Sequence, residues 1–115
     1  MYTVEDVWNK FASQDELAQE YLKVLNTGFK NMQQNIISHY GYENQLKKLV
    51  EELRELQDAI IYENNESHIQ EEMADVLNLI EQIIEFKQWN ENIYSRKWFK
   101  VKRQLKRIEH EKKGK

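Results

Sequence analysis

The fold is decided by two stretches of the sequence, LKKLVEELRELQDAIIY at residues 46–62 and SHIQEEMADVLNLIEQIIEFK at residues 67–87. In each stretch apolar residues recur three or four positions apart, which is the period of one face of an α-helix. The apolar stripes are Leu49, Leu53, Leu56 and Ile60 in the first, and Ile69, Met73, Val76, Ile80 and Ile83 in the second. A polar turn separates them, so we expect two antiparallel helices over about 43–62 and 67–87.

Helix signals continue on both sides of this hairpin. We expect a short helix from about Thr3 to Ala12, a second one opening at the capping box Ser13–Glu16 and broken at 39–42, and a last one from Asn90 or Asn92 that fades after Ile108. The chain has no Pro and only three Gly, which leaves few turns for a sheet. The prediction is therefore an all-α single domain over residues 1–115. Its architecture is an antiparallel bundle of four main helices with a short extra N-terminal helix and a basic tail at 109–115.

Composition excludes several classes of protein. The absence of Cys excludes disulfides and thiolate metal sites. No apolar run approaches the roughly 18 residues of a membrane span, and the N-terminus is acidic, so we expect a cytoplasmic protein with no membrane partner. Residues 96–115 carry ten Lys or Arg against two Glu, whereas residues 1–95 carry seven against eighteen acidic residues. Such a basic arm either binds an anionic ligand or nucleic acid, or compensates the acidic body.

Four carboxylates in the hairpin form the candidate site. Glu52 and Glu55 lie on one flank of the first stripe, and Glu72 and Asp75 lie on the matching flank of the second. The pairs Glu52/Asp75 and Glu55/Glu72 are equally distant from residues 63–64, so all four should lie at one level of an antiparallel pair. Crowded carboxylates repel each other, and a divalent cation with oxygen ligands, such as Mg²⁺, Mn²⁺ or Ca²⁺, removes that conflict. The alternative is that they are ordinary solvated helix residues.

A di-iron bundle also places carboxylates on facing helices, but it requires Glu-x-x-His on two of them. None of the three His has a Glu three positions before it.

Two amides could touch a ligand of the carboxylate site: Gln45, on the same flank as Glu52, and Asn78, one turn beyond Asp75. Both are candidates for a substrate contact.

The same residues resemble a known family. Glu51-Glu52-Leu-Arg-Glu55, sixteen intervening residues and Glu72-Met-Ala-Asp75 are similar to the signature of MazG-like all-α nucleoside triphosphate pyrophosphohydrolases. Gly41–Leu46 before the first motif and the basic positions from Lys100 to Arg107 in the last helix fit as well. The resemblance covers about residues 36–108 and is closest to short, phage-type single-domain members.

The resemblance implies hydrolysis of a nucleoside triphosphate, often a deoxynucleotide, to the monophosphate and pyrophosphate. It implies that Glu52, Glu55, Glu72 and Asp75 hold Mg²⁺, for which Mn²⁺ can substitute, and that one of these carboxylates takes the proton of the attacking water. Lys100 and Arg103 are the candidates for contacts with the substrate phosphates. The preferred base and sugar stay open.

The width of the apolar surface predicts a homo-oligomer. Leu77, Leu79 and Phe86 extend the second stripe to about half of the helix circumference, wider than the roughly 100° that packing on one core requires. We therefore expect a dimer or tetramer; the alternative is that residues 1–35 cover this apolar surface within one chain.

Two other functions stay open: a helical interaction or nucleic-acid-binding protein with a relict metal site, and a purely structural bundle. As its binding partner we expect a nucleoside triphosphate rather than a nucleic acid.

Overall fold

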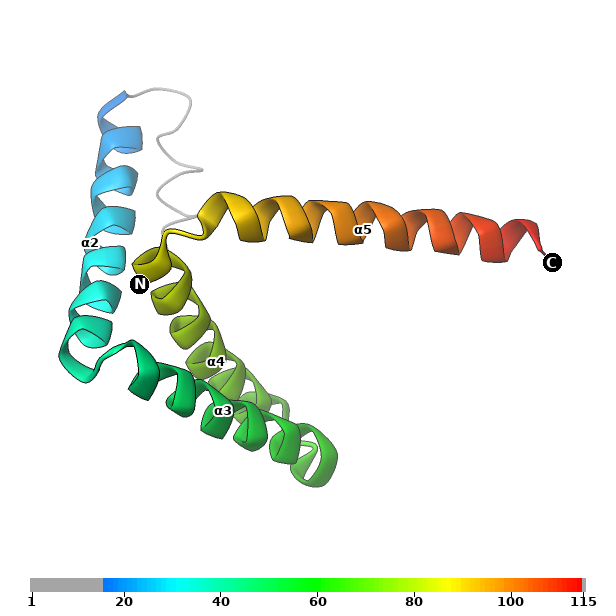
Figure 1. The fold of residues 1–115 in the computed structure, drawn as a ribbon, viewed down its shortest axis with the longest axis horizontal. Coiled ribbons are helices and arrows are strands. Elements are labelled where there is room, and N and C mark those ends of the chain that lie inside the picture. The colour runs from blue at the N-terminus through cyan, green and yellow to red at the C-terminus, as the bar shows by residue number, and fades with distance from the viewer. Residues whose placement is uncertain (1–15, 115) are drawn as a thin grey trace.

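The computed structural model describes residues 16–114, which are almost entirely helical (Figure 1). The elements are α2 (Glu16–Tyr40), α3 (Tyr42–Asp58), the π-helical turn η1 (Ala59–Glu63), α4 (Glu66–Lys87) and α5 (Asn90–Lys113). The described residues contain no strand, so the predictions of an all-α fold and of four main helices are confirmed. The short helix expected at Thr3–Ala12 lies outside the described residues. Within the described part, no helix is both long enough and apolar enough to cross a membrane.

The helix boundaries follow local backbone chemistry. Gly41 separates α2 from α3 with a φ of 92°, a conformation that costs a residue with a Cβ considerable strain. The side chain of Asn65 caps α4 by accepting a hydrogen bond from the His68 N–H at 3.3 Å, so the cap precedes the predicted start at Ser67. Helix α5 continues to Lys113, beyond its predicted end near Ile108. The added residues favour helices, and the cations of its last turn complement the helix dipole.

Three of the four helices pack together. Helices α3 and α4 form an antiparallel hairpin through η1, and α2 packs mainly against α4 and also against α3 (Figure 1). Among the described elements α5 contacts only α4, and it projects away from the other helices. It contains no buried residue. The single chain therefore presents a three-helix unit with a long exposed arm.

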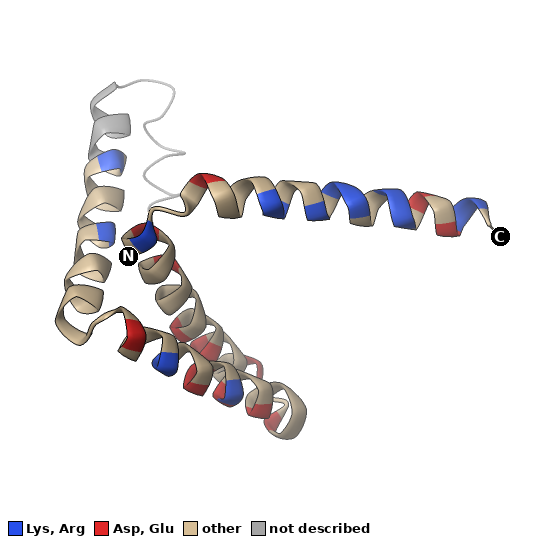
Figure 2. Ribbon diagram, in the orientation of Figure 1, with Lys and Arg blue, Asp and Glu red and all other residues tan. Residues whose placement is uncertain are grey.

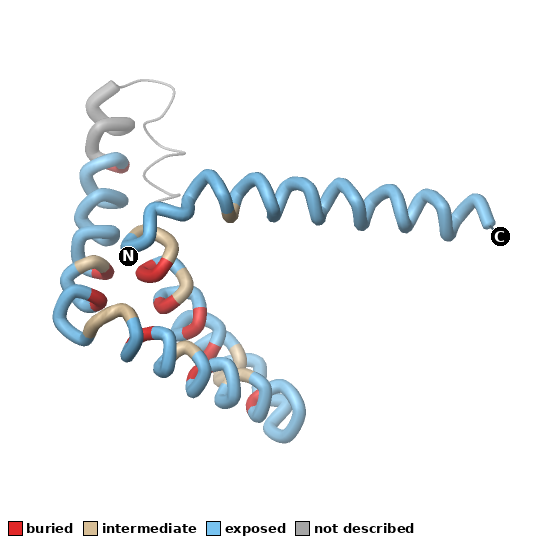
Figure 3. Tube along the Cα trace, in the orientation of Figure 1, coloured by how far each residue is buried: buried red, intermediate tan, exposed pale blue. Residues whose placement is uncertain are grey.

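The interior of this unit is unusually polar. Its buried apolar residues are Leu22, Ile37, Ala59, Val76, Leu79 and Ile83. Its buried polar residues are Gln33, Gln45, Glu52, Glu72 and Gln82. Figure 3 shows these positions on the sides of α2, α3 and α4 that face one another. Because buried polar groups are costly unless they find partners, this interior points to a binding function rather than to simple stability.

The predicted apolar face of α3 is not the buried one. Leu53 and Ile60 are 45% and 51% exposed, whereas Gln45, Glu52 and Ala59 are buried. On α4 the prediction is closer, because Val76 and Ile83 of the expected stripe are buried. The physical reason is that α3 turns the flank with Gln45 and Glu52 toward its neighbours, which leaves much of its apolar stripe in solvent.

Candidate functional site

Three of the four predicted carboxylates converge between α3 and α4. Glu52, Glu55 and Glu72 each offer one oxygen atom, and these atoms all lie within 4.8 Å of one another. Glu52 and Glu72 are only 7% and 9% exposed, while Glu55 is exposed. The carboxylates were expected on the flank of each apolar stripe, and two of them, Glu52 and Glu72, are buried. The antiparallel hairpin brings them together because Glu52 and Glu72 lie on opposite sides of the same turn.

Asp75 lies on α4, one turn beyond Glu72, and its side chain is exposed. It is not part of the three-oxygen cluster, but its negative charge contributes to raising the pKa of Glu52. Asp75 and Glu52 also line the same cavity. The fourth carboxylate therefore lies beside the cluster, at the edge that faces this cavity.

Electrostatics make the cluster receptive to a cation. Burial raises the pKa of Glu52 above its ordinary value, and the neighbouring Glu55 raises it further. The ammonium group of Lys48 opposes this shift from 3.4 Å, where it meets Glu52 Oε1. The other oxygens, Glu52 Oε2 and Glu72 Oε2, are buried and have no hydrogen-bond partner among the described residues. A hard divalent cation fits such a donor set, because it satisfies unpaired carboxylate oxygens and offsets their repulsion.

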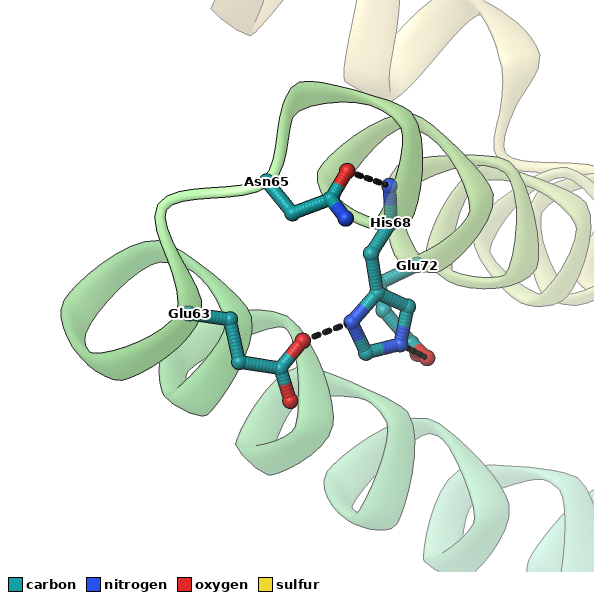
Figure 4. A network of polar contacts seen from close by, with 4 residues as sticks. All are labelled: Glu63, Asn65, His68 and Glu72. Carbon is teal, nitrogen blue, oxygen red and sulfur yellow. Dashed lines mark hydrogen bonds and ion pairs between the residues drawn. The ribbon is translucent and has the colours of Figure 1, made fainter.

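A histidine holds the second buried carboxylate. His68 Nε2 lies 3.1 Å from Glu72 Oε1, and His68 Nδ1 contacts Glu63 Oε2 at the end of η1 (Figure 4). The hydrogen bond with Glu63 is the largest cause that raises the pKa of His68, partly opposed by burial. The sequence analysis did not single out His68 or Lys48. Both lie four residues before the carboxylate that they contact, and this spacing could have identified them.

A cavity of about 470 Å³ adjoins the cluster. Its walls include Glu52 and Asp75, one cation, Lys48, and the exposed aromatic ring of Tyr40. The remaining lining residues are the amides Asn44, Gln45, Asn78 and Gln82 and the aliphatic Ile36 and Leu79. The cavity therefore combines carboxylates, amides, a cation and apolar surface, which is typical of sites for small polar molecules with a planar group.

Hydrogen bonds between the helices hold the amides of this cavity in place. Gln45 Nε2 donates to Gln82 Oε1 at 2.8 Å, which joins α3 to α4. Gln33 Nε2 donates to Asn78 Oδ1 at 3.3 Å, which joins α2 to α4. The two amides singled out in the sequence, Gln45 and Asn78, both line the cavity, and their partners from α2 and α4 become visible only in the structure.

The predicted phosphate contacts lie elsewhere. Lys100 and Arg103 are exposed on α5, which within the described chain contacts only α4. Neither residue lines the cavity. Arg103 instead belongs to a basic surface of α5 with Lys106 and Arg107, and Figure 2 shows this concentration of Lys and Arg along the arm. One chain therefore brings Lys48, but neither of these two cations, to the carboxylates.

Comparison with known proteins gives one match. A sequence profile described as the MazG nucleotide pyrophosphohydrolase domain matches residues 40–103, which is more than half of the chain. The match spans all of α3 and α4, including the four carboxylates, and more than half of α5. No curated protein and no solved structure matches the chain.

Proposed function

Because this chain belongs to the family of MazG nucleotide pyrophosphohydrolase domains, we propose that it hydrolyses a nucleoside triphosphate, with water, to the nucleoside monophosphate and pyrophosphate. The bond that breaks is the anhydride between the α- and β-phosphates. The observation that carries this proposal is the pair of buried carboxylates, Glu52 and Glu72, beside a cavity large enough for a nucleoside; each has one oxygen that lacks a partner in the described part of the chain.

The proposed cofactor is Mg²⁺, with Mn²⁺ as a substitute, held by Glu52, Glu55, Glu72 and Asp75. Carboxylate oxygens without nitrogen or sulfur ligands favour hard cations of this type. When bound, the ion neutralises phosphate charge and makes a water molecule more acidic. A carboxylate of the cluster then accepts the proton of the attacking water. Glu52 suits this role because burial already raises its pKa.

The chain's own residues supply substrate binding. The nucleoside is proposed to occupy the cavity, with Tyr40 available to stack on the base and the amides of Gln45 and Asn78 available for its polar edge. Lys48 reaches the boundary between the cavity and the carboxylates, so it is the local candidate for a phosphate contact. Rigid helices that carry these groups would bind the substrate with little rearrangement.

We further propose that the working form is a homo-oligomer, a dimer or a tetramer, in which α5 of one copy lies against the hairpin of another. Residues 42–87 carry twelve Asp or Glu and four Lys or Arg, whereas α5 carries three Glu and nine Lys or Arg. Both surfaces also expose large apolar residues, including Leu53 and Ile60 on the hairpin and Trp98 and Phe99 on α5. This arrangement would bring Lys100 or Arg103 to the carboxylates of a second copy.

The deciding experiment is product analysis after incubation with each common nucleoside triphosphate and deoxynucleoside triphosphate in Mg²⁺. The expected products are the monophosphate and pyrophosphate, and none should form in excess chelator. Release of a diphosphate and inorganic phosphate would contradict the proposed bond cleavage. Salt-dependent DNA binding with no hydrolysis of any nucleotide would instead favour the nucleic-acid-binding alternative.

A further inference from the structure

We propose that His68 is a positioning residue that fixes the Glu72 carboxylate for cation binding, an inference that rests on the proposed function. His68 lies on the first turn of α4, one turn before Glu72, and its side chain is about one-third exposed. Its Nε2–H donates to Glu72 Oε1 at 3.1 Å. Of the described residues, it is the one that forms a hydrogen bond with this buried carboxylate.

Two further contacts hold His68, one at its backbone and one at its ring. The backbone N–H of His68 is bound by the Asn65 cap at 3.3 Å, and Nδ1 is held by Glu63 Oε2 (Figure 4). Glu63 ends the wide turn η1, which is closed by the hydrogen bond from Asn64 N to Ala59 O at 3.3 Å. A π-helical turn changes the angular position of the residues that follow it, and such turns often occur at functional sites. Here it ends at the residue that reaches the histidine.

The two buried carboxylates, Glu52 and Glu72, are held in the same way, each by one of its two oxygen atoms. Lys48 holds Oε1 of Glu52 and His68 holds Oε1 of Glu72, while Oε2 of each has no partner within residues 16–114. A carboxylate with one oxygen anchored keeps its orientation, so the other oxygen is preorganised as a ligand. Without an anchor, Glu72 would rotate away from the like charges of Glu52 and Glu55. The orientation of Glu72 therefore depends on His68.

Two substitutions separate positioning from a structural role at the end of the hairpin. The amide nitrogen of Asn lies at the same number of bonds from Cα as Nδ1 of His, and that of Gln matches Nε2. His68→Asn therefore keeps a donor toward Glu63 and loses the one toward Glu72, whereas His68→Gln does the reverse. Glu66→Gln, an exposed change at the start of the same helix, is the control.

The measurement is calorimetric binding of Mn²⁺ to the full chain without nucleotide. Loss of a group that anchors a ligating side chain typically weakens metal binding about 10–100-fold, and we expect this range for His68→Asn. His68→Gln should remain close to the unchanged protein, and Glu66→Gln should equal it. Three outcomes would overturn this inference and leave the proposed function standing. They are His68→Asn binding Mn²⁺ as tightly as the wild-type protein, His68→Asn binding it more tightly, and both His68 variants weakening binding equally. No Mn²⁺ binding by the unchanged protein would overturn the proposed function as well.

A second measurement does not depend on the folding of a variant. In the unchanged protein, adding Mg²⁺ should shift the NMR signals of the His68 ring, which contacts a ligand, and leave those of His110 at the end of α5 in place. Mg²⁺ binding with no change at His68 would also overturn the inference.

Discussion

Replacing Glu52 by Gln should stabilise the cation-free protein and abolish its stabilisation by cations. Glu52 is 7% exposed, its Oε2 has no partner in the part of the chain that the structure describes, and burial and Glu55 both disfavour its charge. Gln keeps a polar group at this position but removes its charge; a buried unpaired group costs about 1–3 kcal/mol and more when it is charged, and we take about 1 kcal/mol as the difference because the helical unit is small and water lies near. The contact with the exposed Lys48 is screened by solvent and offsets little. The free energy of unfolding should thus rise by about 1 kcal/mol.

Thermal melting by circular dichroism, at one protein concentration, tests this value. In excess chelator the variant should melt about 4 °C higher than the unchanged protein, the shift that about 1 kcal/mol gives in a domain of this size. In Mn²⁺ at a hundred times its Kd the order should reverse, because the unchanged protein gains about 2.7 kcal/mol and the variant does not. Glu51→Gln, next to it on the exposed side of α3, should respond to Mn²⁺ as the unchanged protein does. A Glu52→Gln variant that melts lower in chelator, or that keeps the Mn²⁺ shift, would refute the reasoning.

Four further outcomes follow from the site and the arm. Glu72→Gln and Asp75→Asn should each abolish most pyrophosphate release while keeping the helical circular dichroism spectrum, and full activity in both would exclude the proposed ligands. Lys100→Ala and Arg103→Ala should raise KM for the triphosphate, which steady-state kinetics would detect; unchanged constants in both would leave α5 without a role in binding. Sedimentation should show a dimer or tetramer. An active 14.1 kDa monomer would contradict the proposal that α5 of one copy lies against the hairpin of another. In chelator, the free energy of unfolding measured with urea should fall as the pH rises above about 4.5, because the pKa of Glu52 is higher in the folded protein than in the unfolded chain. Glu52→Gln should make this fall with pH less steep.

The sequence predicted the helices well because their signals are local. The apolar period predicted the start of α3 and both ends of α4 to within one residue, and Gly41 defined the break before α3. The predicted end near Tyr62 is wrong for α3 itself, which ends at Asp58 and continues as the π-helical turn η1 to Glu63. The spacing about the hairpin turn predicted that four carboxylates converge, and the structure brings Glu52, Glu55 and Glu72 together while Asp75 lies beside them. These features depend on backbone geometry within one hairpin, and no distant contact is needed to derive them.

Other features depend on contacts that no local pattern contains. Which face of α3 is buried depends on its packing against α4, where the buried Gln45 of α3 donates a hydrogen bond to Gln82. The anchor at His68 depends on the wide turn η1, for which the sequence gives no separate signal. Sequence reasoning therefore located the carboxylates but missed the side chains that hold them.

The polar interior also has a consequence for how such a protein can change under selection. Apolar replacements at Gln33, Gln45 and Gln82 would remove buried amides, and filling such positions with hydrophobic side chains commonly stabilises a fold. A directed-evolution experiment that rewarded heat resistance alone would therefore tend to convert the proposed substrate cavity into an ordinary core. One that rewarded turnover as well should retain the amides and gather its stabilising mutations on the outer faces of the helices, away from the cavity.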